Sequence, residues 1–453
     1  TDPAVHTVSI RKPSQVGAAL DLDTPIPTPD GWTTMGALSK GDQVFDETGA
    51  ICAVEYVSPV YTGHRCYEVE FSDGEVIVAD HDHRWFVRSH RPLLNGCLYN
   101  VSGRPPSELN LRYENVLTTA QMVAAVNEFG AKSRNLFSVP VCGPLDTCEA
   151  ELPVDPYYLG LWLGDGNRHS SIFTSHDVDT PNVIRILHER GLVCIAGTHS
   201  HGVDQTRVHL PSEDPMLCPV GHDKRVVGMF GPHNQCRECA RQMSKFSQHG
   251  TPLKDARKKR DSMTRRLKGL NLLGCEKVVP DVYLRASREQ RTDLLAGLID
   301  SDGSVGKNGR VYFYNTEESL FFGVLELVRS LGFKPSVRKR PPSDVVSKAR
   351  NHDVVSRLPL WELSFCAYEG SGVCKLPRKL DRLRMPGVGR STETRYRWIT
   401  SIREVASRPV KCIQVNSKSH LYLCGRGMIP THNTEMFNNV VGYFIDRDPG
   451  SML

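Results

Sequence analysis

Two segments of the chain end in the same glycine–acid pattern, YLGLWLGDG at 158–166 and LLAGLIDSDG at 294–303. Apolar runs closed by glycine, the first of them entered through Pro156, predict two buried helices. Asp165 and Asp302 occupy matching places 137 positions apart, which indicates two pseudo-repeated halves within one domain. A fold with two such helices at its centre is the strongest constraint that the sequence imposes.

The two ends of the chain have a different character, because short strands predominate there. CAVEYV, CYEVEF and EVIVAD between 20 and 90 predict strands with a turn at SDG (72–74), and KCIQV and HLYLCG return to this pattern between 410 and 430. Residues 89–110 carry loop signals. An α/β block inserted into an all-β domain is the simplest explanation.

Composition narrows the class of protein. The 453 residues are 39% hydrophobic and 24% charged, which excludes a disordered or fibrous chain and suggests about three domains. No apolar run approaches the roughly 18 residues of a membrane span, and the N-terminus lacks the apolar core of a signal peptide. We therefore expect a cytoplasmic protein with no membrane partner. Fourteen scattered cysteines predict buried thiols, and any close cluster of them predicts a metal site or a nucleophile.

The basic residues are clustered, although the net charge of +5 is too small to imply nucleic acid by itself. Residues 241–270 hold ten Lys or Arg against two Asp, and 334–350 and 375–397 are also basic. These stretches are suited to neutralise DNA phosphates, which predicts strongly salt-dependent binding. A solvated basic face is the alternative interpretation.

LLAGLIDSDG matches the LAGLIDADG motif at nearly every position, and YLGLWLGDG is similar to the weaker second motif. About residues 150–385 therefore resemble a two-motif LAGLIDADG homing endonuclease, which implies an α+β domain that cuts double-stranded DNA. Small residues let the two helices approach closely: Gly160, Ala296 and Gly297. The resemblance implies that Asp165 and Asp302 meet at the DNA surface and share Mg²⁺. Without it, a Gly-Asp helix end is usually a structural cap.

Two further features accompany these motifs. Lys277, in EKVVPDVYL, stands where this family often carries a supporting lysine, and an ordinary surface lysine is the alternative. Residues 318–333, ESLFFGVLELVRSLGF, predict the helix that follows the second motif.

The segment 218–239, between the two motifs, contains a cluster of metal-binding side chains. It supplies two chelating pairs: Cys218 with His222, and Cys236 with Cys239. Thiolate and imidazole ligands at this spacing suit a closed, structural Zn²⁺ site, and the segment is similar to the zinc knuckles of phage DNA-binding enzymes. His233 is a competing ligand, and scattered thiols are the alternative. We expect the basic segment after it to form a helix that lies against DNA.

The first strand-rich region resembles the opening of an intein. ALDLDTPIPTPDGWTTMGALSKGDQVFD at 19–46 carries the opening strand, a DGW turn and a GDQV motif. VADHDHRW at 78–85 resembles the second intein motif, with Asp80 and His83 at the spacing that usually reads Thr-x-x-His. The resemblance implies that both side chains contact the amide nitrogen at the upstream splice junction.

The last strand-rich region, VKCIQVNSKSHLYLCGRGMIPTHNT at 410–434, resembles the C-terminal region of an intein. Asn433 is suited to attack its own carbonyl with its side-chain amide, and His432 to polarise that bond or protonate the leaving amine. Thr434 offers a hydroxyl as acyl acceptor, and His420 is an expected assistant in the downstream cleavage. The resemblance implies the β-rich horseshoe called the Hint fold, which splices without a cofactor.

Position 19 departs from the intein pattern, because Ala19 replaces the Cys or Ser that usually starts the reaction. Either this replacement has disabled splicing or another residue attacks. Cys412, Trp85 and Thr434 together resemble the set of class 3 inteins, in which the internal Cys attacks the upstream bond. Taken singly, Cys412 and Trp85 are more typical of core packing.

Removing 19–433 joins KPSQVGA to TEM, which resembles the phosphate-binding loop of phage terminase large subunits. This resemblance implies a phage-encoded host protein in a bacterial cell, with Lys12 on phosphate and Thr434 facing Mg²⁺. A fragment of a DNA-packaging ATPase is an alternative function, but the insertion splits its loop.

The sequence thus predicts a mixed fold, an all-β Hint splicing domain interrupted by an α+β LAGLIDADG endonuclease domain with a small zinc-binding insertion. Its segments are an N-terminal extein 1–18, splicing parts 19–135 and 386–433, an endonuclease domain 136–385 with a zinc knuckle at about 214–245, and a C-terminal extein 434–453. We expect a monomer that acts on its own flanks and on DNA. A splicing-competent intein whose endonuclease domain only binds DNA is the remaining alternative.

Overall fold

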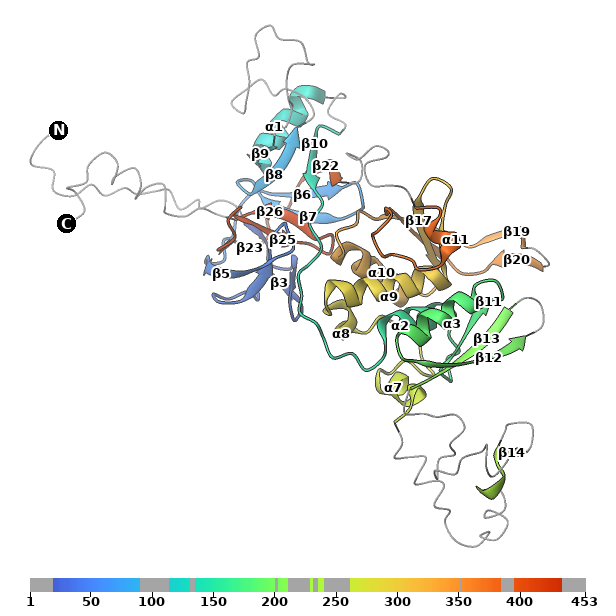
Figure 1. Ribbon diagram of the computed structural model, residues 1–453. Helices are drawn as coiled ribbons and strands as arrows, with labels where there is room; N and C mark the ends of the chain where they lie inside the picture. Colours follow the sequence, from blue (N-terminus) through green and yellow to red (C-terminus); the bar gives the residue numbers. More distant parts are fainter. Residues whose placement is uncertain are drawn as a thin grey trace, which may run out of the picture. The chain divides into compact units, whose positions relative to one another are not determined.

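The computed structural model describes residues 19–89, 114–130, 135–199, 203–210, 229–230, 235–239, 261–349, 352–383 and 395–433. The chain divides into two compact units (Figure 1). The first comprises Thr1–Cys148, Val328–Val337 and Gly387–Leu453, and the second comprises Glu149–Leu327 and Arg338–Pro386. The expected exteins 1–18 and 434–453 lie outside the described residues. Among the helices that are described, none has the length and apolar character needed to cross a membrane.

The first unit is built almost entirely of strands. Its main strands are Leu20–Asp21 (β1), Cys66–Phe71 (β6), Val76–Asp80 (β7), Arg84–Ser89 (β8), Glu114–Thr118 (β9), Phe137–Pro140 (β10), Tyr396–Val405 (β22) and Val410–Lys411 (β23). They form one sheet in the order β23-β1-β7-β6-β22-β10-β8-β9. Segments from the first and last parts of the described chain therefore share one sheet, since β23 and β1 are neighbours in it.

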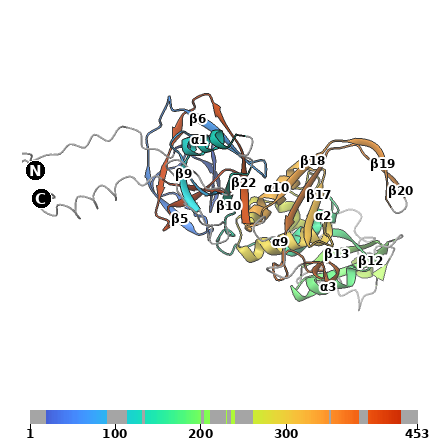
Figure 2. The same cartoon turned by 90° about the horizontal axis from the view of Figure 1, so that it is seen from above.

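Three smaller sheets complete this unit. Their strands are Pro25–Thr28 (β2), Gly31–Thr34 (β3), Gln43–Phe45 (β4), Ile51–Val57 (β5), Ile413–Val415 (β24), Leu421–Cys424 (β25) and Ile429–His432 (β26). The pairings are β2 with β3, β24 with β5 and β4, and β25 with β26. The strands curl around an apolar core that includes Trp85, Phe71 and Tyr422 (Figure 2).

One helix, Thr119–Phe129 (α1), contributes to this core. Its N-terminus is closed by a capping box in which Thr118 and Gln121 bind each other's backbone amides. Met122 and Ala125 on its inner face pack into the apolar cluster. The helix thus covers one side of the curled sheet rather than forming a layer of its own.

Two details of the first unit differ from the expected pattern. KCIQV is not one strand, because the strand is interrupted at Cys412 between β23 and β24. β10 pairs with β8 and β22 and so belongs to the all-β unit, whereas the sequence placed it in the insertion that was expected to begin at residue 136. The ladder hydrogen bonds of β10 are the physical reason.

The second unit is centred on the two glycine-rich helices, Pro156–Asp165 (α2) and Arg288–Ser301 (α9), which lie side by side (Figure 1). Asp155 caps the first helix by accepting a hydrogen bond from the Tyr158 amide, and Pro156 occupies its first turn, as the sequence predicts. Both helices are buried along most of their length.

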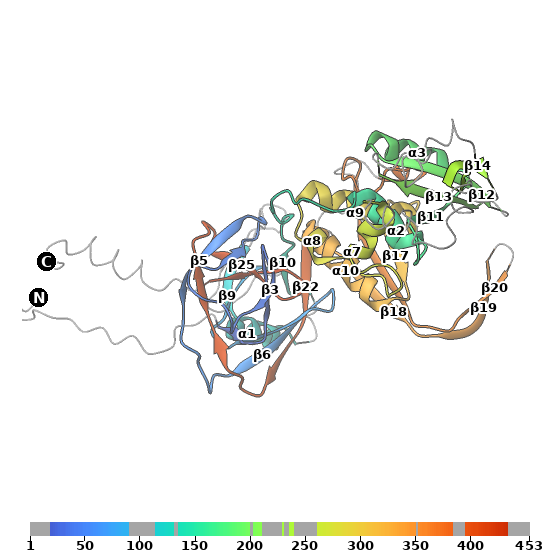
Figure 3. The same ribbon diagram turned by 90° about the horizontal axis from the view of Figure 1, so that it is seen from below.

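Strands and short helices surround this pair. The strands are Ile172–His176 (β11), Val193–His199 (β12), Val203–His209 (β13), Gly303–Val305 (β16), Arg310–Asn315 (β17), Ser336–Arg340 (β18) and Leu360–Cys366 (β21). They form one sheet β11-β13-β12 and one sheet β16-β17-β21-β18 (Figure 3). The helices are Thr180–Glu189 (α3), Met263–Gly269 (α7), Asp281–Leu284 (α8), Glu318–Ser330 (α10) and Pro377–Leu380 (α11).

Each half of this unit repeats one order, a central helix followed by strands and a further helix, α3 in the first half and α10 in the second. The predicted pseudo-repeat and the predicted helix at 318–333 are therefore confirmed. Two short ribbons lie outside this repeat: Met229–Phe230 (β14) with Gln235–Cys236 (β15), and Ser343–Ala349 (β19) with His352–Ser356 (β20). The expected fold class, an all-β unit interrupted by an α+β unit, is confirmed.

Candidate functional sites

Cys412, Ala19, Asp80 and Cys66 lie in one row across the main sheet of the first unit. The register pairs Leu20 with Lys411 on one side and with Ala79 on the other, and pairs Cys66 with Asp80. Moving one residue along these antiparallel strands sets Ala19 between Cys412 and Asp80, and the Asp80 amide donates to the Ala19 carbonyl at 3.0 Å. Ala19 and Cys412 also belong to one buried cluster, so Cys412 lies close to Ala19 although it is not itself part of a strand.

This row is closed to solvent. Ala19, Cys66 and Cys412 belong to one small buried cluster, and Cys412 is 1% exposed. Ser58 holds the Cys412 backbone out of the ladder: its hydroxyl accepts from the Cys412 amide, and its own amide donates to the Cys412 carbonyl, both at 3.0 Å. The strand interruption thus fixes the backbone of the expected nucleophile.

Asp80 is a buried carboxyl group with one polar partner side chain. Its Oδ2 lies 3.1 Å from Nδ1 of His64, and its Oδ1 has no hydrogen-bond partner among the described residues. Burial raises the pKa of Asp80 above its ordinary value, and the hydrogen bond and charge of His64, followed by the backbone amide of Ala19, act in the opposite direction. Sequence reasoning missed His64, since no motif marks GHRC.

His83 lies beneath the C-terminal strand of the unit. Its Nε2 is 2.5 Å from Oγ1 of Thr431, in β26, and its ring meets the Trp85 ring edge-on at 4.7 Å. The Trp85 indole donates to Oγ1 of Thr119 at 3.1 Å. Trp85 therefore supports His83 and the core; the idea that it also holds the Cys412 thiol stays a prediction.

Asn433 is fully buried at the end of β26. Its side-chain amide donates to the Val415 carbonyl at 3.0 Å, and its backbone amide donates to the His420 carbonyl at 2.8 Å. His432 donates from Nδ1 to the Asn433 carbonyl at 2.5 Å. The rings of His420 and His432 are 6.2 Å apart. The residue expected to polarise the downstream bond thus contacts its carbonyl oxygen directly.

In the second unit, α2 and α9 touch backbone to backbone. A Cβ on Gly160 would lie 2.3 Å from the Leu294 carbonyl oxygen, and one on Gly297 would lie 2.1 Å from the Tyr157 carbonyl oxygen. Ala296 is also fully buried. The prediction that small residues allow this close approach is confirmed.

The close approach brings Asp165, at the end of α2, and Asp302, just after α9, near each other. Burial and the charge of Asp165 raise the pKa of Asp302 to about 6. Burial likewise raises the pKa of Asp165, while the charges of Lys277 and Lys379 lower it. Two carboxylates that repel each other in one place suit a divalent cation, because Mg²⁺ binds through one or two carboxylates and completes its shell with water and phosphate. No third His, Cys, Asp or Glu joins such a group within the described residues.

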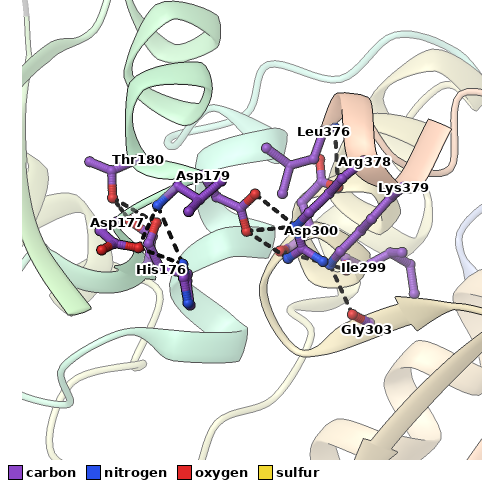
Figure 4. Close-up of polar contacts among 12 residues, drawn as sticks. His176, Asp177, Asp179, Thr180, Ile299, Asp300, Gly303, Leu376, Arg378 and Lys379 are labelled. Atoms are coloured by element: carbon purple, nitrogen blue, oxygen red, sulfur yellow. Dashed lines mark hydrogen bonds and ion pairs between the residues drawn. The ribbon is translucent and has the colours of Figure 1, made fainter. Parts of the chain in front are cut away.

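Two buried lysines accompany the acid pair, one at each helix end. Lys277 donates from Nζ to the Gly164 carbonyl at 2.8 Å, and burial lowers its pKa. Lys379 donates from Nζ to carbonyls at the end of α9, those of Ile299, Asp300 at 2.9 Å and Gly303 at 2.8 Å (Figure 4). Burial lowers the pKa of Lys379 to about 8. Lys277 is thus not an ordinary surface lysine.

Lys379 was missed as a site residue because it lies within the basic stretch 375–397, where phosphate neutralisation was expected. It is 2% exposed instead. Asp300, in α9, holds the segment that carries Lys379 against this helix. Its carboxylate accepts hydrogen bonds from the Tyr157 hydroxyl at 3.0 Å and from the Lys375 amide at 2.8 Å. Arg378 binds both oxygens of Asp179, at the start of α3 (Figure 4). No spacing in the sequence identifies Lys379 as a partner of the acid pair.

Several predicted site residues lie outside the described residues, namely Thr434 and Lys12 at the flanks and Cys218, His222 and His233 in the zinc segment. Most of the expected basic helix 241–270 also lies outside, and only α7 is described there. Cys236 and Cys239 are described and buried, and the Cys239 amide donates to Sγ of Cys236 at 3.5 Å. Zinc binding stays a prediction.

Two comparisons concern relatives in sequence. The chain is 31% identical over 426 residues to a replicative DNA helicase DnaB of Mycobacterium intracellulare, which covers 93% of this chain and 59% of the relative. It is 41% identical over 131 residues to a replicative DNA helicase DnaB of Mycobacterium leprae, which covers 28% of this chain and 21% of the relative. The chain therefore spans less than two thirds of these curated relatives. Neither is a terminase, so the expected phage terminase context is not supported.

Solved structures give weaker likenesses. The MchDnaB-1 intein aligns with 92% of this chain and all of its own length at 15% identity and a TM-score of 0.25. The Msm DnaB1 intein splicing domain bound with zinc gives the same coverages at a TM-score of 0.26. I-DmoI in complex with DNA and Ca covers 51% of this chain and 95% of its own at 11% identity and a TM-score of 0.23. TM-scores this low identify no residues.

The family model described as Homing endonuclease matches residues 279–360. The matched segment includes α9, Asp302 and α10. The acid at the end of the second glycine-rich helix thus lies inside a homing endonuclease region, and the expectation that the chain carries an enzyme of this DNA-cleaving class is borne out.

Proposed function

We propose that the first unit is a Hint-type splicing domain that excises residues 19–433 and joins Ala18 to Thr434, with Cys412 as the first nucleophile. The row across the main sheet carries this proposal. Ala19 has no nucleophilic side chain, and Cys412, which directly follows the strand paired with β1, lies in the same buried cluster. A thiolate is the reactive form of cysteine, so the buried thiol must lose its proton to start the reaction.

The proposed steps balance as follows. The Cys412 sulfur bonds to the Ala18 carbonyl carbon, the bond to the Ala19 nitrogen breaks, and that nitrogen receives a proton, a transfer for which Asp80 and His83 are the expected groups. The Thr434 oxygen then replaces sulfur on the same carbon, and the thiol regains its proton. The Asn433 side-chain nitrogen attacks its own carbonyl carbon and releases the Thr434 amine, which takes the acyl group from oxygen.

Support for the downstream step comes from the contacts of Asn433. Its side-chain nitrogen is held by the Val415 carbonyl, and its own carbonyl is polarised by the His432 Nδ1–H group. A carbonyl that accepts a short hydrogen bond is a better electrophile, because the donor stabilises the developing negative charge on oxygen. The proposed attack therefore joins two groups that the fold already restrains.

The splicing proposal is tested with different tags on the two ends and mass analysis for the ligated flanks. Cys412→Ser should stop upstream cleavage and ligation, while Asn433-dependent downstream cleavage survives. Cys66→Ser is the matched control, since Cys66 lies in the same buried row. Normal ligation in Cys412→Ser would contradict the assignment, and Ala19 would then be an inactivating replacement.

We further propose that the second unit is a LAGLIDADG-type homing endonuclease that cuts double-stranded DNA. The match over 279–360 and the coupled carboxyl groups of Asp165 and Asp302 support this. Asp165 and Asp302 would hold Mg²⁺, which when bound activates water and stabilises the leaving oxygen of a phosphodiester. Lys277 and Lys379 orient the two helix ends and balance the charge of the acid pair.

The cutting proposal is tested on duplex DNA spanning the coding sequence of the joined flanks, with Mg²⁺. Asp302→Asn should abolish cutting while DNA binding persists, and Asp261→Asn, on the surface of the same unit, should not. Binding without cutting by the wild-type protein would favour the alternative of a degenerate, DNA-binding-only domain.

Zinc binding by the insertion is a separate proposal that rests on four soft ligands: Cys218, His222, Cys236 and Cys239. Freshly purified protein should contain about one zinc ion per chain. Cys236→Ser with Cys239→Ser should release it and weaken DNA binding more than splicing. Metal-free protein with full DNA affinity would overturn this proposal.

A further inference from the structure

His64 is the only described side chain that the structure places in hydrogen-bond contact with the buried Asp80 carboxyl group. Asp80 is 1% exposed and His64 is 24% exposed at its side chain. The His64 ring also stacks on the Tyr61 ring, with centroids 5.3 Å apart and planes 14° apart. The ring is therefore held on one face by an aromatic group and at its Nδ1 edge by a carboxyl group.

The second oxygen of the Asp80 carboxyl group, Oδ1, suggests what the His64–Asp80 pair is for. Oδ1 of Asp80 is buried and meets no hydrogen-bond partner of normal geometry within the described residues, although the backbone amide of Ala19 lies close enough to the carboxyl group to lower its pKa. A buried polar atom left without a partner is costly, so it is uncommon in a folded protein. Asp80 lies next to Ala19 in the row, and its backbone amide already binds the Ala19 carbonyl. The unsatisfied oxygen thus belongs to the residue that adjoins the upstream splice junction.

We propose that His64 is a positioning residue for the upstream splice junction, which binds Oδ2 of Asp80 so that Oδ1 serves the junction. This inference rests on the proposed splicing function. With a proton on Nε2 of His64, the contact is a hydrogen bond in both states: Nδ1 donates to Oδ2 when Asp80 is ionised, and Nδ1 accepts from the carboxyl group when Asp80 is neutral. His64 therefore keeps the carboxyl group in place whether it accepts or donates a proton at the Ala19 nitrogen.

The sequence gives a reason why such a partner is needed here. The resembling motif usually carries a threonine where this chain has Asp80, and a hydroxyl is neutral. A carboxylate in the same buried place needs a donor, because desolvation opposes its charge. The ionisable groups that act on or near Asp80 are His64, Asp82, Tyr61, Cys66 and Tyr422, and His64 is the one that stabilises its charged form.

The test uses two variants of the full-length precursor that separate the ring from the hydrogen bond. His64→Phe keeps a ring against Tyr61 and removes the donor, whereas His64→Asn places an amide nitrogen where Nδ1 stands. His64→Phe should slow dithiothreitol-induced release of the N-terminal segment by roughly 10-fold. His64→Asn should stay within about threefold of wild type, and downstream cleavage at Asn433 should change little in both.

A second set of variants removes the negative charge of Asp80, which His64 stabilises. Asp80→Thr in the His64→Phe background should release the N-terminal segment faster than His64→Phe alone, because a neutral hydroxyl needs no partner. A merely structural role of His64 does not predict this recovery. Equal losses in His64→Phe and His64→Asn, or unchanged release in His64→Phe, would overturn the inference.

The pairing also has a readout that does not depend on splicing. In an Asn433→Ala precursor with ¹³C-labelled aspartate, His64→Phe should raise the pKa of Asp80 further, since His64 lowers it in the wild type. An unchanged pKa would overturn the pairing. A wild-type precursor that releases no N-terminal segment would instead overturn the proposed splicing chemistry, and the Asp80 titration would still decide whether His64 is its partner.

Discussion

The two units restrain their reactive groups in different ways. In the first, Asp80 ends β7, Ala19 directly precedes β1 and Cys412 directly follows β23. These three strands are neighbours, and their ladders together with Ser58 fix the spacing of the three residues inside a solvent-free sheet. In the second, Asp165 and Asp302 stand at the ends of two helices, where burial raises the pKa of both carboxyl groups and the charges of Lys277 and Lys379 act against that shift. The contrast matches the proposed substrates, since the first centre acts on its own backbone and the second must admit a separate, highly charged molecule.

The largest expected effect tests whether the two centres are chemically independent. Cys412→Ser should lower ligation by roughly 10³-fold and leave DNA cutting within about twofold of wild type. Asp302→Asn should do the reverse. Both activities are measured on the same purified preparations. Loss of both activities in either variant would show that the centres are coupled.

The next effect concerns the helix contact of the second unit. Gly297→Ala should destabilise that unit by about 3 kcal/mol, because its Cβ would overlap the Tyr157 carbonyl oxygen in the facing backbone. Hydrogen exchange of the α2 and α9 amides measures the change. Gly269→Ala at the end of α7 is the control, since a Cβ there meets nothing within 4 Å and should stabilise by about 0.5 kcal/mol.

A smaller effect distinguishes the acid pair of the second unit from the first unit, because the stability of the second unit should depend on pH. The folded-state pKa of Asp302 is about 6, above the unfolded value of about 3.9, so the folded state holds this proton more tightly. The contribution to stability is full below about pH 4 and is lost as the pH rises through 6. Without divalent ions, Asp302→Asn should therefore stabilise the second unit by about 1–2 kcal/mol at pH 7 and by nothing at pH 4. A constant difference across this range would contradict the raised pKa of Asp302 that burial and the charge of Asp165 produce.

The smallest effect concerns the support of His83 in the first unit. Thr119→Val leaves the buried Trp85 indole without its hydrogen-bond acceptor, and should cost about 1 kcal/mol and slow splicing by about threefold. Thr400→Val, at an exposed site of β22, is the matched control. Splicing at the wild-type rate in Thr119→Val would show that Trp85 has no part in the reaction.

Local patterns in the sequence predicted much of the fold. The strands of the first unit and the two glycine-rich helices follow from short-range spacing, and the close contact between these helices follows from the resemblance to the LAGLIDADG motif. The terminase context did not follow, because 38 flanking residues carry too little information to separate one host from another.

The site residues that the sequence did not reveal depend on contacts between positions far apart in the chain. His64 and Lys379 have no distinctive neighbours in sequence, and each is recognisable only when the fold buries it beside an acid or a helix end. Similarly, the strand interruption at Cys412 depends on Ser58, which is 354 positions away. Periodicity cannot report such contacts, since it describes only one element at a time.

The placement of β1 has a consequence for the direction of the proposed reaction. β1 has only two residues, but it is hydrogen-bonded on both sides, to β23 and to β7. Once the upstream bond is cut, the new amine of Ala19 stays tethered beside the thioester at a high effective concentration. Resynthesis of the original peptide bond is therefore always in competition with splicing. In the proposed reaction, the cleavage at Ala19 is reversible, and only the cyclisation of Asn433 makes the overall reaction irreversible. A variant that slows this cyclisation should therefore contain mostly unspliced precursor and little of the thioester intermediate.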